Sequence, residues 1–193
     1  TGEHVDRMSS YAQIIARQMG MGSEEQALIK LAAPMHDIGK IGIPDSILLK
    51  KGKLTTEEYA VMKAHPTIGA RILAGSGSKL LQMAEKIAAT HHEKWDGTGY
   101  PNGLAGNEIP LAGRVVALAD VFDALTSPRV YKDAWSIDEA VTYIHGLAGL
   151  HFDPRVIQAF DQCLDRLLAV RATHMGHDAQ PAAALDAARS EVQ

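Results

Sequence analysis

The chain has little cysteine and few aromatic residues, and each shortage limits which folds are possible. Cys163 is the one cysteine among 193 residues, which excludes an internal disulfide and suits a reducing compartment. Aromatic residues make up 5% of the sequence, so we expect an aliphatic core of Leu, Ile, Val, Ala and Met, with Cys163 as a filler. No apolar run is long enough to span a bilayer, and no signal peptide stands at the start.

An excess of positive charge is also missing. The chain has 19 basic and 23 acidic residues, a formal net charge of -4. This balance argues against a protein that binds a nucleic-acid polymer or a membrane surface, since both need a basic face. A small anionic substrate stays open, because a few local cations or metal ions can outweigh the global charge.

The hydrophobic pattern that is present is helical nearly throughout. Apolar residues recur at three- and four-residue steps from Val5 to Met19, and Gly20 and Gly22 stop that helix. Further helices are expected at 28–35 (continuing into His36-Asp37 and breaking at Gly39), 80–92, 115–122 and 153–172. No alternating strand pattern of convincing length is present, so the sequence predicts an all-α domain, a helical bundle.

Two capping boxes mark further helix starts. Thr55 is followed three residues later by Glu58, and Ser136 by Glu139. Between the predicted helices, the segment Glu93–Pro110 is rich in Gly, Pro, Asn and Asp and is too long for an ordinary connection.

The chain is expected to hold one domain and a tail. The helical pattern covers residues 1–172, whereas residues 173–193 turn Ala-rich and are expected to be weakly ordered or to pack only in an assembly. The chain opens at Thr1 without an initiator Met, so we expect a fragment of a longer protein.

Histidines and carboxylates cluster near the predicted helix ends. Two adjacent pairs stand out, His36-Asp37 and His91-His92. A further carboxylate, Asp120, lies on a later predicted helix. Neighbouring helical residues point about 100° apart, so such pairs suit two ions lying side by side better than one. Two ions about 3.5–4 Å apart can activate a bridging water and stabilise both oxygens in phosphoester hydrolysis. The alternative, histidines that only form surface or hydrogen-bonding contacts, stays open from spacing alone.

Two sequence motifs resemble a known family. His36-Asp37-Ile38-Gly39-Lys40 is similar to the HDIGK core of the HD superfamily of metal phosphohydrolases. The run from His91 to Pro101, HHEKWDGTGYP, resembles the HHExxDGxGYP signature of the HD-GYP subfamily. The likeness extends from Thr1 to about Leu150.

The resemblance implies a set of metal ligands and two transition-metal ions. Fe or Mn is favoured, and Ni, Co or Zn is an alternative, because mixed His and Asp ligation suits several of these ions. Three-metal members of the family use a glutamate four residues before the first ligand, a position that lies before Thr1 here, so we expect two ions. The implied ligands are His4, His36, Asp37, His65, His91, His92 and Asp120.

Three cations are expected to hold the substrate. The resemblance assigns Lys40, beside Asp37, to the scissile phosphate or to water activation. Arg129 and Lys132 lie in a stretch similar to the family's TSxRxYK segment and are expected to contact substrate. The alternatives are a solvated lysine at 40 and a structural salt bridge from Arg129 to the 93–110 loop.

The remaining polar residues are expected to have supporting roles. We expect Asp123 to orient a ligand histidine rather than to bind metal itself. His145 and His151 are expected to be structural. The segment Glu93–Pro110, which contains the Gly-Tyr-Pro sequence of the signature, is interpreted as a structural lid that holds Asp96 and Arg114. In the family this loop is also implicated in docking GGDEF-type cyclase domains.

By this resemblance we expect a cytoplasmic cyclic di-GMP phosphodiesterase of bacterial second-messenger signalling. It would release the linear dinucleotide pGpG and then GMP without a protein nucleophile. An upstream receiver or sensor domain is a further expectation. The alternatives are a phosphodiesterase for cyclic GMP-AMP or for pGpG, a catalytically weak cyclic-dinucleotide sensor, and a purely structural bundle.

Overall fold

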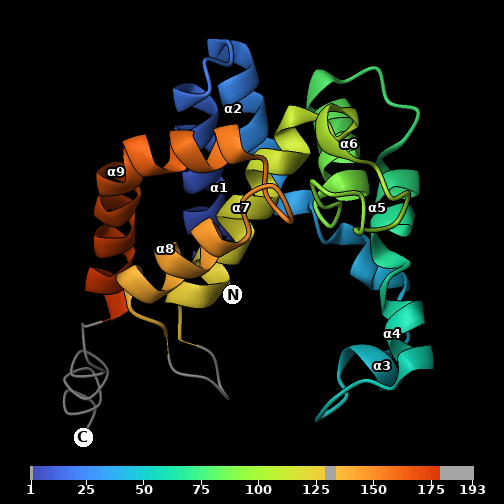
Figure 1. Cartoon of the computed structure of the whole chain (residues 1–193). Helices are drawn as coiled ribbons and strands as arrows, with labels where there is room; N and C mark the ends of the chain where they lie inside the picture. The colour runs from blue at the N-terminus through green and yellow to red at the C-terminus, as the bar shows by residue number, and fades with distance from the viewer. Residues whose placement is uncertain (1, 129–133, 179–193) are drawn as a thin grey trace, which may run out of the picture.

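The computed structural model describes residues 2–128 and 134–178, and these form helices joined by turns and one long loop (Figure 1). No strand occurs within these two ranges, so the all-α prediction is confirmed. No helix in them is long and apolar enough to cross a membrane. The α-helices are α1 (Gly2–Gln18), α2 (Ser23–Ala32), α3 (Asp45–Leu48), α4 (Thr56–Met62), α5 (His65–Leu73), α6 (Lys79–Thr90), α7 (Leu111–Thr126), α8 (Ile137–Gly146) and α9 (Pro154–Asp178).

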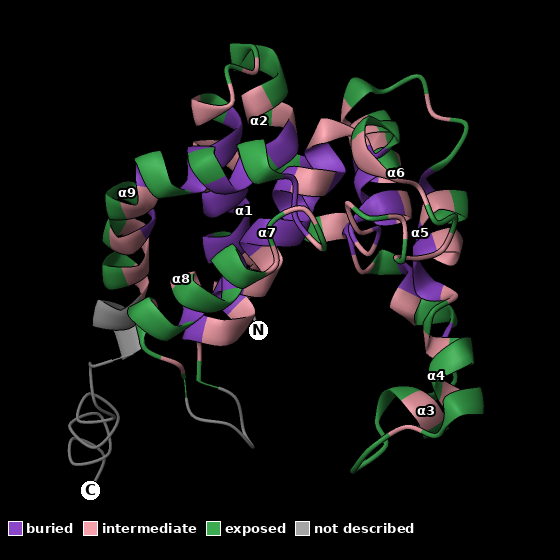
Figure 2. Ribbon diagram, in the orientation of Figure 1, coloured by how far each residue is buried: buried purple, intermediate pink, exposed green. Residues whose placement is uncertain are grey.

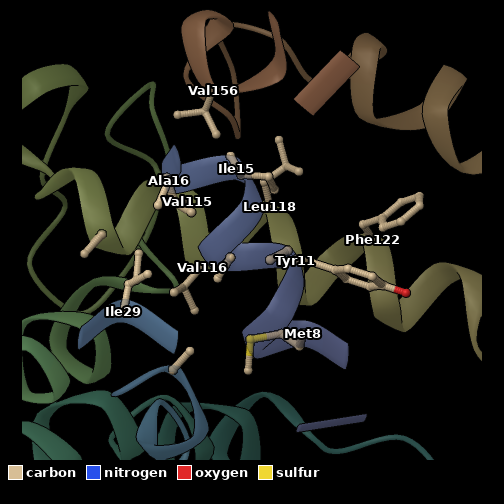
Figure 3. Close-up of a cluster of buried hydrophobic side chains, with 14 of the residues drawn as sticks. Met8, Tyr11, Ile15, Ala16, Ile29, Val115, Val116, Leu118, Phe122 and Val156 are labelled. Carbon is tan, nitrogen blue, oxygen red and sulfur yellow. The ribbon is translucent and has the colours of Figure 1, made fainter. Parts of the chain in front are cut away.

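Helices α1 and α7 lie at the centre of the core. α1 packs against α2, α7 and α9, and buried residues concentrate in α1 and α7 (Figure 2). Tyr11 of α1 meets Phe122 of α7 edge to face at 5.5 Å between ring centroids (Figure 3). All three phenylalanines of the chain are buried, and Phe122 also contacts Phe160 of α9. The prediction of a purely aliphatic core was therefore wrong, because Tyr11, Phe122 and Phe160 pack together where α1, α7 and α9 meet. Cys163 is buried in this core, as expected.

The helix expected to run from residue 28 into His36-Asp37 was also partly wrong. α2 ends at Ala32, and two short 3₁₀ helices follow, η1 (Ala33–Met35) and η2 (Ile38–Gly42). Pro34 has no amide hydrogen for an α-helical bond to the preceding turn, which explains the change of helix type. His36 and Asp37 therefore lie at a junction rather than within a helix.

Both predicted capping boxes are present. The Thr55 hydroxyl accepts from the amide of Glu58, and the Ser136 hydroxyl from that of Glu139. The loop 93–110 contains one 3₁₀ turn, η3 (Gly106–Glu108), and no α-helix. α9 continues to Asp178, six residues past its expected end, so 173–178 are helical, and 179–193 lie outside the described residues. The boundary between domain and tail stays a prediction.

Helices α3 and α4 form an arm that projects from the rest of the fold (Figure 1). No residue of either helix is buried (Figure 2). The arm leads directly into α5, whose first residue is His65. α5 packs against η2, which brings the His36-Asp37 junction next to His65.

Gly39 permits this packing, which gives a first prediction. A Cβ at position 39 would lie 1.9 Å from the carbonyl oxygen of His65 and 2.4 Å from the amide nitrogen of Gly69. We expect Gly39→Ala to lower the free energy of unfolding by about 3 kcal/mol, because backbone must move to admit the methyl group. Urea unfolding measures this loss.

The control is Gly77→Ala, whose Cβ would meet no described atom within 4 Å. Its free energy of unfolding should stay within about 0.5 kcal/mol of the original value. Equal stability of the two variants would show that the close approach at Gly39 is not a packing constraint.

Candidate metal centre

Five segments bring the predicted ligands together. His4 lies on α1 and Asp120 on α7, whereas His36 and Asp37 lie between η1 and η2. The other three stand at helix ends, where the chain turns: His65 begins α5, and His91 and His92 follow α6. Their donor atoms form two groups, within each of which all lie within 4.8 Å of one another. The first holds Asp37, His65, His91 and His92, and the second holds His4, His36 and Asp120.

Asp37 lies between the two groups. Its Oδ1 atom is 3.3 Å from Nε2 of His65 and 3.8 Å from Nε2 of His91. Its Oδ2 atom is 3.3 Å from Nε2 of His36, which belongs to the second group. Oδ1 is buried and has no hydrogen-bond partner among the described atoms. One carboxylate thus presents one oxygen to each group, the arrangement that a bridging ligand needs.

Backbone contacts fix the tautomers of three histidines. Nδ1 of His36 lies 2.8 Å from the carbonyl oxygen of Ala33, and Nδ1 of His65 lies 2.8 Å from that of Met62. Nδ1 of His91 is 3.1 Å from the carbonyl oxygen of Ala88. A carbonyl oxygen only accepts, so each Nδ1 carries a hydrogen and a neutral ring keeps its lone pair on Nε2.

Those Nε2 atoms face one another. Nε2 of His65 is 3.4 Å from Nε2 of His91, and both point at Asp37. Two lone pairs at this separation repel unless a proton or a cation lies near them. The donor set of imidazole nitrogens and carboxylate oxygens therefore fits a transition-metal ion in each group.

Burial sets the protonation states that a metal requires. It lowers the pKa of His91 well below its usual value and lowers the pKa of His92 to about 3. Burial opposes ionisation of Asp37, but the close approach of the His36 and His65 rings outweighs it and lowers the pKa of Asp37. For His36 burial is outweighed by the bond to Asp37, and its pKa is raised. At neutral pH the lone pairs of His91 and His92 and the negative charge of Asp37 are thus available to a cation, and positive charge is favoured beside Asp37.

Asp123 orients His4, as expected from the sequence. Its Oδ2 atom is 2.6 Å from Nδ1 of His4, which leaves Nε2 of that ring 3.5 Å from Oδ1 of Asp120. Arg7 donates to Asp123 through Nε at 2.7 Å and Nη2 at 3.1 Å. Burial opposes ionisation of Asp123, but the bonds from His4 and Arg7 lower its pKa. The role of Arg7 was missed, although its position three residues after His4 puts both on one helix face.

Of the three expected cations, one is described. The Lys40 ammonium donates to Oδ2 of Asp37, so it lies at the edge of the centre. Arg129 and Lys132 lie outside the described residues, and their expected contacts stay predictions.

Glu93 organises the loop that borders the centre. Its buried carboxylate accepts from the amides of Asn102 at 2.8 Å and Leu104 at 3.1 Å. Tyr100 stacks on His92 with 4.7 Å between ring centroids. A Cβ at Gly99 would lie 2.3 Å from the amide nitrogen of Lys94, so this part of the loop needs glycine. The role of Glu93 could not be read from the sequence, since exposed and buried carboxylates look alike there.

The loop holds Asp96 and Arg114 only in part. Asp96 accepts from Thr98 within its own turn, whereas Arg114 is bound to Asp153 at the start of α9, at 2.6 Å. The loop adds the Trp95 ring, 5.6 Å from the Arg114 guanidinium. The interpretation of the loop as the holder of Arg114 was thus incomplete.

His145 and His151 have the structural positions expected of them. Exposed His145 pairs with Asp161, and the carbonyl of His151 accepts from the amide of Trp95 at 3.0 Å, which ties the loop to the start of α9. Neither belongs to the two ligand groups.

Comparisons with known proteins identify the family of the chain. The family described as HD domain matches residues 1–156. The chain is 51% identical over 172 residues to the cyclic di-GMP phosphodiesterase response regulator RpfG of Xanthomonas campestris, covering 89% of this chain and 44% of that protein. It is 46% identical over 173 residues to 3'3'-cGAMP-specific phosphodiesterase 2 of Vibrio cholerae, covering 90% of this chain and 33% of that protein. The chain thus spans less than half the length of these relatives.

Two solved structures share the fold. A cyclic GMP-AMP specific phosphodiesterase of Vibrio cholerae aligns with a TM-score of 0.67 and 22% identity, covering 91% of this chain and 47% of that one. A Bdellovibrio bacteriovorus protein described as HDG"Y"P aligns with a TM-score of 0.64 and 22% identity, covering 84% and 51%. Both support the helical bundle expected from the sequence.

The Asp123 contact generates a second prediction. Asp123→Asn removes the charge that pairs with buried Arg7 and loosens the orientation of His4. We expect metal affinity to fall about 10- to 100-fold and stability to fall by about 3 kcal/mol. Metal titration and thermal unfolding measure the two effects. Asp6→Asn, an exposed change on α1, the helix of His4 and Arg7, should alter neither, and unchanged affinity in Asp123→Asn would contradict the orienting role.

A third prediction concerns acid stability. Burial lowers the pKa of His151 from 6.5 to about 4. The unfolded chain therefore binds a proton at this residue at higher pH than the folded one, so the contribution of His151 to stability is constant above about pH 6.5 and falls as the pH drops towards about 4. We expect His151→Asn to flatten this loss in urea titrations with chelator present, and the exposed-site change His145→Asn to leave it. An unaltered slope in His151→Asn would contradict the prediction.

Proposed function

The chain belongs to the HD domain family, and from this premise we propose that it hydrolyses cyclic di-GMP as a metal-dependent phosphodiesterase. The observation that carries the proposal is the convergence of seven His and Asp side chains into two groups that meet where Asp37 lies beside His36. A relative 51% identical over most of this chain is named a cyclic di-GMP phosphodiesterase, which supports the substrate.

Two metal ions are part of the proposal, with Fe or Mn favoured over Ni, Co or Zn. Bound there, they would supply Lewis acidity for attack of water on a phosphodiester. Asp37 would serve both ions, since its two oxygens face different groups. The ligands proposed for one ion are Asp37, His65, His91 and His92, and for the other Asp37, His4, His36 and Asp120.

The chain's own cations would hold the substrate. Lys40 lies against Asp37 and can reach a phosphate placed at the centre, where its charge favours the anion. Arg129 and Lys132 are proposed as further contacts to phosphate or guanine. No serine or cysteine nucleophile is needed, since water is the attacking group, and the products would be pGpG and then GMP.

The whole protein is proposed to work in cytoplasmic second-messenger signalling. One relative is named a response regulator and is more than twice as long as the matched part, which supports a receiver or sensor domain elsewhere in the protein. Docking of a GGDEF domain through the loop 93–110 is a further proposal.

A second candidate substrate has specific support. A relative at 46% identity is named a 3'3'-cGAMP-specific phosphodiesterase, so cyclic GMP-AMP is the alternative to cyclic di-GMP. Linear pGpG and a sensor role without turnover are the other outcomes that an assay must separate.

Turnover by the metal-loaded protein tests the proposal and is the fourth prediction. We expect cyclic di-GMP to be converted to pGpG, and the rate to need added Fe or Mn. Asp37→Ala should lower the rate at least about a hundredfold, because it removes an oxygen from each group. Asp45→Ala, an exposed change on α3, should leave it unaltered.

A substrate panel completes this experiment. Faster turnover of cyclic GMP-AMP or pGpG would move the assignment to that compound. Binding of cyclic di-GMP without turnover in any metal would contradict the enzyme and favour the sensor.

A further inference from the structure

One lysine at the base of the projecting arm lies between two tyrosine rings. Lys63 is the C-cap residue that directly follows α4, and its ammonium nitrogen is 4.8 Å from the centroid of the Tyr59 ring. The same nitrogen is 5.5 Å from the centroid of the Tyr100 ring, which belongs to the loop 93–110. These are cation–π contacts, and they join two segments that are far apart in the sequence.

The tyrosine pair connects this lysine to the candidate metal centre. Tyr100 stacks on His92, a proposed ligand, and Tyr59 approaches Tyr100 from the arm. Burial and the neighbouring Tyr59 phenol raise the pKa of Tyr100, so its hydroxyl stays neutral. Lys63 is therefore linked to His92 through Tyr100, and Tyr59 lies beside both Lys63 and Tyr100.

The charge of Lys63 is held in place without being neutralised. Within residues 2–128 and 134–178, none of the ion pairs includes Lys63, whereas Lys50 on the same arm is paired with Glu58. The side chain is exposed, as is that of Tyr59. At an exposed site, ring faces orient an ammonium group only weakly and leave its hydrogens free to bind an anion.

A cyclic dinucleotide has two phosphodiesters, and the centre engages one of them. Lys40 lies against Asp37 and serves the phosphate at the metals, so it is not available to the other. Lys63, which lies beside Tyr100 next to the centre, offers a second cation for the other phosphodiester. The simple alternative is a solvated lysine that only caps α4, and it predicts no preference for a substrate with two phosphates.

We propose that Lys63 binds the phosphodiester that is not being hydrolysed, and that Tyr59 positions its ammonium group. This inference rests on the proposed function and deepens it, since the arm would favour the binding of substrates with two phosphate groups. The base of the arm would thus help to distinguish a cyclic dinucleotide from a single phosphodiester.

Steady-state kinetics of the metal-loaded protein test this proposal, using cyclic di-GMP and bis(p-nitrophenyl) phosphate, which has one phosphodiester. We expect Lys63→Met to raise the KM for cyclic di-GMP about tenfold relative to the KM for the single phosphodiester, with a smaller change in kcat. Lys53→Met makes the same charge change on the exposed loop of the arm and should shift this ratio less than about twofold. An equal shift in both variants would overturn the proposal.

Two further variants separate positioning from folding. Tyr59→Phe keeps the ring face and should retain the original KM ratio, whereas Tyr59→Leu should raise it as Lys63→Met does. Persisting turnover of the single phosphodiester shows in each case that the centre is intact. Equal KM ratios for the Phe and Leu variants would overturn the positioning role of Tyr59.

The proposed function can fail separately. If neither compound is hydrolysed but cyclic di-GMP binds, its Kd replaces KM, and a tenfold weakening in Lys63→Met but not in Lys53→Met still supports the inference. A protein that neither hydrolyses nor binds cyclic di-GMP would contradict both proposals.

Discussion

Inward-facing histidine nitrogens around the half-buried carboxylate of Asp37 are the constraint on which the rest of the structure depends. Backbone carbonyls occupy Nδ1 of His36, His65 and His91, so the lone pairs of Nε2 converge on Asp37. Such a cluster is unfavourable without positive charge among the rings. Gly39 and the 3₁₀ turns after α2 bring the junction close to α5, and the loop 93–110 places Tyr100 over His92. The fold therefore stabilises a site whose own groups repel one another.

Much of the fold and of the ligand set could be predicted from sequence, because local signals encode both. Helical periodicity located α1, α6, α7 and α9, and the two motifs located the ligands, which the structure brings within reach of one another. The 3₁₀ segment was misassigned because apolar spacing continued through Pro34, although proline cannot supply the helical hydrogen bond. The short helices α3 and α4 have no buried face, so periodicity could not reveal them.

Supporting residues were harder to predict, since their roles depend on contacts across the fold. Arg7 and Asp123 are far apart in the sequence, and only the packing of α1 on α7 pairs them. Glu93 belongs to the signature, yet its burial and its two amide partners emerge only when the loop closes. Lys63 belongs to neither of the two motifs. Its position between two tyrosines depends on the contact between the arm formed by α3 and α4 and the loop 93–110.

Anomalous diffraction from crystals grown with manganese tests the central claim most directly, because it locates the ions without relying on activity. We predict two anomalous peaks, one beside His65, His91 and His92 and the other beside His4, His36 and Asp120, with Asp37 between them. A single peak, or peaks away from Asp37, would contradict a two-ion centre bridged by this carboxylate.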